Sequence, residues 1–185
     1  MIYPVTVIGH PTLRKRAEEI DKDYPELDKI IDNMFETMYE SDGVGLAAPQ
    51  INKSIRIIVI DGEPMAEDDP ELEDFKMVLI NPEMVEEWGD EVLMTEGCLS
   101  IPGIREDVNR NGEIKIKYLD RDFNKHEETF NGMKARIIQH EYDHLEGVLF
   151  TDKISPLRKK ILKSKLLGIS KGKFKASYRT VLGRK

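Results

Sequence analysis

His140, Glu141 and His144 form the pattern His-Glu-x-x-His. Residues four apart lie on one face of a helix, so the two imidazoles can bind one metal ion. The glutamate directly after the first histidine can reach a water molecule beside that ion and act as a base without being a ligand. The pattern therefore predicts a helix that carries part of a catalytic metal site.

Two histidines do not complete such a site, because a catalytic zinc-type centre takes three protein ligands and keeps one position open. The candidates for the third ligand are His10, His126, Cys98 and a carboxylate. Cys98 is the single cysteine of the chain, which excludes an internal disulfide. A lone cysteine is more often a small buried apolar residue than a ligand. Because the two-histidine site is incomplete, we expect Cys98 to be a metal ligand and not a buried apolar residue.

A zinc endopeptidase is the first alternative for a chain with this pattern. Such a protease would take a third ligand downstream of His144. There the chain offers only Glu146 and Asp152 as His, Asp or Glu donors, and both are too close in sequence to turn back easily. This spacing weakens the protease interpretation.

The elements that position these residues follow from the hydrophobic periodicity. Apolar residues at steps of three and four predict a helix that opens at Pro25, and a second helix is expected at about 133–145, stopped by Gly147. Strands are expected at 55–60, 78–82 and 114–118, and the strand at 114–118 is expected to pair with one that ends near 131–132. Pro82 should end the second of these strands or place it on an edge of the sheet.

Strands in the middle of the chain with helices at either end indicate an α+β fold. We expect antiparallel or mixed β-sheets around a central metal-binding helix, with an N-terminal helix and a basic C-terminal helical tail. Eight of the fourteen residues from 61 to 74 are acidic, so this segment is expected to be a solvated loop without a chemical role.

The chain of 185 residues has the composition of a soluble globular domain with a heavily charged surface. It has no run of 18 apolar residues, and its first residues lack an apolar stretch long enough for a signal peptide. We therefore expect a cytoplasmic protein that binds neither membrane nor DNA.

Three segments resemble the motifs of the peptide deformylase family, in the same order and spacing. They read GVGLAAPQ at 43–50, EGCLS at 96–100 and QHEYDHL at 139–145, and HPTLR at 10–14 resembles the N-terminal segment of the family. The likeness runs from about residue 3 to residue 155.

A ribosome- or RNA-binding module with a structural metal is a further alternative, but a closed structural site needs a fourth ligand that is not evident.

The resemblance implies a metal-dependent hydrolase that removes the formyl group from N-formylmethionyl nascent polypeptides and releases formate. It assigns the metal to Cys98, His140 and His144, and proton transfer to Glu141. It assigns stabilisation of the developing oxyanion to the side chain of Gln50 and the backbone N–H of Leu99. Substrate-binding positions follow from the same motifs: Val44, Gly45 and Ile137. One divalent ion is expected per chain, ferrous iron as the usual native metal of the family, with zinc, nickel or cobalt able to occupy the same ligands.

The C-terminal segment is strongly basic. From residue 153 onward there are 12 Lys and Arg and no acidic residue, although the whole chain carries a net charge of −7. We expect a catalytic domain at 1–152 and a basic extension at 153–185 packed on it. Ser155 and Pro156 begin a helix whose apolar stripe would comprise Leu157, Ile161, Leu162 and Leu166. The resemblance also suggests the ribosome as a partner of this tail.

Overall fold

A computed structural model describes residues 1–183 of the chain. It has the expected α+β architecture. The helices are α1 (Leu27–Glu40), α2 (Gly132–Leu145) and α3 (Pro156–Ser170). The strands are β1 (Val5–Thr6), β2 (Gly45–Ala47), β3 (Ile57–Asp61), β4 (Lys76–Gly97), β5 (Arg105–Leu119), β6 (Lys125–Asn131) and β7 (Thr180–Val181).

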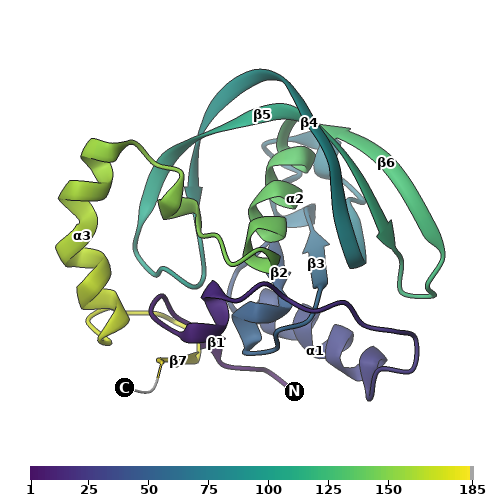
Figure 1. Ribbon diagram of the computed structural model, residues 1–185, viewed down its shortest axis with the longest axis horizontal. Coiled ribbons are helices and arrows are strands. Elements are labelled where there is room, and N and C mark those ends of the chain that lie inside the picture. The colour runs from purple at the N-terminus through teal and green to yellow at the C-terminus, as the bar shows by residue number, and fades with distance from the viewer. Residues whose placement is uncertain (184–185) are drawn as a thin grey trace.

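The main sheet is antiparallel, with five strands in the order β2-β3-β4-β5-β6. Figure 1 shows α2 beneath the arch of the long strands β4 and β5, with α1 at the lower edge of the molecule and α3 to one side. The terminal strands β1 and β7 form a separate parallel pair. The two ends of the described chain are thus joined to each other, on the side of the molecule away from the arch.

Strand β3 explains how the sheet is covered on both faces. Ile58 and Ile60 pack in a cluster with α2, whereas Ile57 and Val59 pack in a cluster with α1. Successive side chains of a strand point to opposite faces, so a strand between two helices is apolar at every position. Helix α2 therefore packs on one face of the sheet and α1 on the other.

Strand β4 does not end at Pro82 but continues through it, at the point where β4 is no longer paired with β3. Pairing with β3 ends at Ile80, and the register of β4 against β5 shifts between Ile80 and Glu83. Asn81 has a φ of 48° and exchanges side-chain hydrogen bonds with the backbone of Ile20. Pro82 lies inside this bulge, where no ladder hydrogen bond from its nitrogen is required.

The acidic segment 61–74 is not a plain solvated loop, contrary to the prediction. It contains two short 3₁₀ turns, at Glu63–Met65 and Pro70–Leu72. Leu72 is fully buried in the cluster around α2, and Met65 packs against the same cluster. Two apolar anchors therefore fix the segment to the domain. Most of its acidic side chains are exposed, but Asp61 is buried and accepts a hydrogen bond from the hydroxyl of Tyr39.

Helix α3 packs against the earlier part of the chain in a buried cluster that contains Val7 and Phe150, but its predicted apolar stripe is partly wrong. Leu162 and Ile169 are buried, whereas Leu157 and Ile161 are 67% and 55% exposed. The helix touches the domain along one narrow line, so residues on its other side stay in solvent. After α3 the chain is not helical and runs through turns and bends to the short strand β7. No helix of the described residues is long and apolar enough to cross a membrane.

Candidate metal centre

The structure brings Cys98, His140 and His144 together. Their ligand atoms all lie within 4.8 Å of one another, and Cys98 Sγ is 3.3 Å from His144 Nε2. The histidines lie four residues apart on α2, and the cysteine lies in the turn that follows β4. This is the only such group of three His, Cys, Asp or Glu residues found within residues 1–183.

The other two histidines have different roles. His10 precedes a short 3₁₀ turn, where its Nδ1 accepts a hydrogen bond from the backbone N–H of Thr12. His126 lies on β6 and pairs with Asp120 at 2.7 Å. Of the named candidates for a third ligand, Cys98 alone forms a group with both imidazoles within residues 1–183, whereas the carboxylate of Glu96 lies against Nδ1 of His140.

A buried carboxylate orients His140. Glu96 Oε1 lies 2.7 Å from His140 Nδ1, which leaves Nε2 of that ring free to face the cysteine side of the site. Arg110 donates two hydrogen bonds to the same carboxylate, and Arg136 donates one. Burial alone would raise the pKa of Glu96, but the hydrogen bonds from His140 and Arg110 outweigh it and hold this pKa well below the usual range. Glu96 is therefore ionised and fixed.

Glu141 has a different environment. Its side chain is buried, and its Oε2 has no hydrogen-bond partner among the described residues. Burial raises the pKa of Glu141 to about 7, which suits a group that takes up and releases a proton near neutral pH. A Cβ on Gly45 would lie 2.6 Å from Glu141 Oε1, so only glycine leaves room for this carboxylate.

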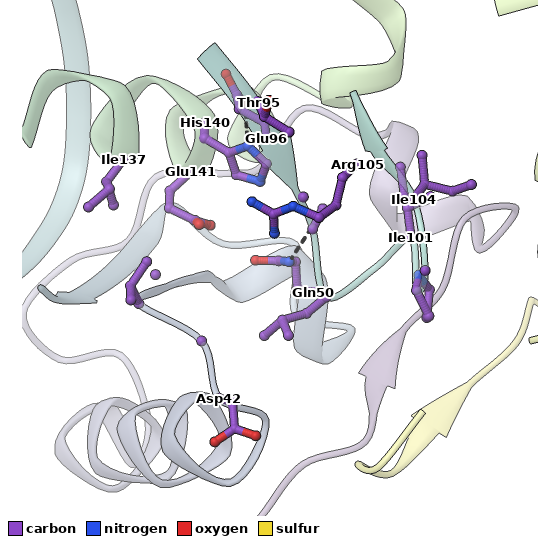
Figure 2. A pocket seen from close by; sticks show the side chains of 18 of the residues that line it. Asp42, Gln50, Thr95, Glu96, Ile101, Ile104, Arg105, Ile137, His140 and Glu141 are labelled. Atoms are coloured by element: carbon purple, nitrogen blue, oxygen red, sulfur yellow. Dashed lines mark hydrogen bonds and ion pairs between the residues drawn. The ribbon is translucent and has the colours of Figure 1, made fainter. Parts of the chain in front are cut away.

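Gln50 and Leu99 present hydrogen-bond donors beside the group of Cys98, His140 and His144. The backbone N–H of Ala47 donates to Gln50 Oε1 at 2.8 Å, which turns the amide nitrogen toward Ser100 Oγ at 3.3 Å and Cys98 Sγ at 3.6 Å. Figure 2 shows Gln50, His140 and Glu141 around one space. The backbone N–H of Leu99 has no hydrogen-bond acceptor within residues 1–183.

These groups line a cleft of about 740 Å³. Val44, Gly45 and Ile137, the expected substrate-binding positions, all border this cleft, and Ile137 also packs in the core beside α2. Met65, from the acidic segment, and Met133 lie on the same cleft. The cleft thus has an apolar wall close to a polar centre.

Several residues of the site lie outside the sequence prediction. The motif EGCLS includes Glu96 but assigns it no role. No motif includes Arg110, Met65 or Tyr178. A signal existed for Arg110, because the period of two places it on the same face of β5 as the buried Val108. No local pattern marks Met65 or Tyr178 as cleft residues.

The donor set fits a divalent metal ion. One thiol and two imidazoles are the ligands that zinc, iron and related ions take, and burial lowers the pKa of His144 well below its ordinary value, so that its ring is neutral as a ligand must be. A three-ligand site that opens on a cleft and adjoins an unpartnered glutamate is that of a metal-dependent hydrolase.

Comparison with known proteins specifies the family. The family model described as polypeptide deformylase matches residues 2–160, so the chain belongs to that family. The peptide deformylase of Christiangramia forsetii is 52% identical over 187 residues, covering 97% of this chain and 95% of that protein. That of Flavobacterium psychrophilum is 50% identical, covering 98% of this chain and 97% of that protein.

Solved structures of peptide deformylases are also similar to this chain, which agrees with its membership of the family. A peptide deformylase structure from Plasmodium falciparum is 38% identical with a TM-score of 0.81, covering 91% of this chain and 95% of that chain. The structure from Thermotoga maritima is 42% identical with a TM-score of 0.76, covering 84% of this chain and 99% of that chain.

Proposed function

We propose that this chain hydrolyses the N-terminal formyl group of N-formylmethionyl nascent polypeptides and releases formate. The observation that carries the proposal is the convergence of Cys98, His140 and His144 beside the unpartnered carboxylate of Glu141. Family membership supports the substrate class. We place the reaction in the cytoplasm, where nascent chains are available.

Cys98, His140 and His144 would hold one divalent ion, ferrous iron in the cell and zinc, nickel or cobalt as replacements. When bound, the ion supplies a Lewis acid that lowers the pKa of water. The chain itself orients the ligands, since Glu96 holds the His140 ring by a 2.7 Å hydrogen bond.

Glu141 is the proton-transfer group. It takes a proton from the attacking water and later delivers it to the nitrogen of the departing amine, so that the formyl C–N bond breaks while a C–O bond forms. Its burial and its pKa of about 7 support both steps, because the carboxylate can accept the proton and the acid can give it up at the same pH.

Gln50 and Leu99 stabilise the negative charge that develops on the formyl oxygen. The hydrogen bond from Ala47 holds the Gln50 amide in place before the substrate arrives, so little reorganisation is needed. The free N–H of Leu99 is the second donor. Val44 and Ile137 border the methionine side chain, and Gly45 lets the extended substrate come close to the backbone.

The test is formate release from a formyl-Met peptide, measured together with metal content. A matched assay on an internal peptide bond distinguishes this activity from that of a zinc endopeptidase. We expect formate release proportional to bound metal and no cleavage of the internal bond. Cleavage of the internal bond without formate would refute the proposal.

The basic C-terminal extension, residues 153–185, is proposed as a contact for ribosomal RNA. Four lysines of α3 are exposed: Lys159, Lys160, Lys163 and Lys165. Contacts to phosphates release counterions, so binding would weaken steeply with salt. The measurement is ribosome co-sedimentation of the full chain and of a chain ending at Ser155 across a salt series. Equal, salt-insensitive binding by both chains would refute the contact.

A further inference from the structure

The C-terminal segment forms part of the cleft wall. Residues 175–178 line the same cleft as Cys98 and His140. Figure 2 shows the C-terminal chain in yellow on the side of the cleft where Ile101 and Ile104 lie. None of the site motifs includes this segment, and it is separated from α2 in sequence by the whole of α3.

Tyr178 connects this segment to the metal-binding turn. Its hydroxyl donates a hydrogen bond of 2.7 Å to the backbone carbonyl of Leu99, and its ring is half-buried. Within residues 1–183, no other hydrogen bond reaches that carbonyl. Leu99 directly follows Cys98, and its N–H is one of the two proposed oxyanion donors. The Leu99 carbonyl and N–H belong to neighbouring peptide planes that share the Leu99 Cα, so a displacement of Leu99 that broke the bond to Tyr178 would also displace this N–H.

The strand that follows Tyr178 is tied to the segment of the other oxyanion donor as well. Strand β7 follows Tyr178 closely and pairs in parallel with β1. Thr6 of β1 donates from Oγ1 to the carbonyl of Pro49, next to Gln50, at 3.0 Å. Just beyond β1, the N–H of Ile8 donates to the carbonyl of Ser100 at 2.8 Å. The terminal strands thus hold both donor segments against each other.

We propose that Tyr178 is a positioning residue for catalysis, which fixes the Leu99 N–H relative to Gln50 through the Leu99 carbonyl. The inference rests on the proposed function, because it concerns the donors for the formyl oxygen. Tyr178 acts through Leu99 and does not contact the formyl group. Its effect should be on the rate of the chemical step, since a donor misplaced by a fraction of an ångström loses much of its effect in the transition state.

The experiment compares three full-length, zinc-loaded proteins: wild type, Tyr178→Phe and the control Tyr118→Phe. Tyr118 also donates its hydroxyl to a partner, Glu128, at 2.9 Å, but it lies in the core beside α2 and outside the cleft. Formate release from a formyl-Met tripeptide gives kcat and KM. Zinc content, Tm and hydrogen exchange of peptides covering 98–101 are measured on the same samples.

We expect Tyr178→Phe to lose about tenfold in kcat, less than the ~10²–10³ of a lost oxyanion donor. KM, zinc content and Tm should match the control, and hydrogen exchange at 98–101 should be faster in Tyr178→Phe alone. An unchanged kcat, or a fall in Tm or zinc content without this change in exchange, would overturn the positioning role. Absence of formate release by the wild type would instead refute the proposed function, and this inference with it.

Discussion

Replacement of Gly45 by alanine tests whether Glu141 must occupy its observed position. The added Cβ would lie 2.6 Å from Oε1 and 2.9 Å from Cδ and Cγ of Glu141. An ordinary contact begins near 3.4 Å, so the carboxylate or the strand β2 must move by about 0.8 Å. A misplacement of ~1 Å at a reacting group costs on the order of 10² in rate. We therefore expect kcat to fall roughly 30- to 100-fold, about 2–2.7 kcal/mol in activation free energy.

The assay is formate release by metal-loaded Gly45→Ala, with Tm and metal content measured in parallel. The matched control is Gly112→Ala on β5, where an added Cβ would make only ordinary contacts, the nearest being 3.4 Å from the carbonyl of Asp90. The control should keep wild-type kcat. If Gly45→Ala retained wild-type kcat with a normal Tm, the position of Glu141 would not limit the reaction, and the steric reasoning would be refuted.

Glu141→Gln should keep its metal and lose more than 90% of the rate (a loss of about 1.4 kcal/mol or more in transition-state stabilisation), because an amide does not carry the proton; a tenth of the wild-type rate would exclude Glu141 as the base. Cys98→Ser should bind metal more weakly or exchange it, since a hydroxyl is a poorer ligand than a thiolate, and unchanged metal content by elemental analysis would remove Cys98 from the site. Asp152→Asn should lower Tm at pH 7, and the Tm difference from the wild type should shrink as the pH falls below 3.8. Burial raises the pKa of Asp152, but its hydrogen bonds with Arg14 and the N–H of Leu149 outweigh this and lower it, so its stabilisation is present above its ordinary pKa of 3.8 and is lost as pH falls. A Tm difference independent of pH would contradict that reasoning.

Local periodicity alone determined the parts of the site that lie on one element. His140, Glu141 and His144 are fixed relative to one another by the helix repeat, because a spacing of four residues selects one face whatever the rest of the chain does. The uninterrupted apolar run of β3 likewise required cover on both sides, which α1 and α2 provide. The motifs around Gln50 and Cys98 indicate the family by sequence alone, without any tertiary contact.

Only the tertiary structure decided which distant residues complete that arrangement. It set Cys98 and not His10 or His126 beside the imidazoles, and it placed Glu96 against His140 and the half-buried Tyr178 against Leu99. Such contacts join residues that are tens of positions apart, and they leave no periodic pattern in the sequence. Pro82 and the exposed Leu157 show the same limit: whether a bulge absorbs a missing N–H, or a helix buries one face or another, depends on the surface that the rest of the chain presents.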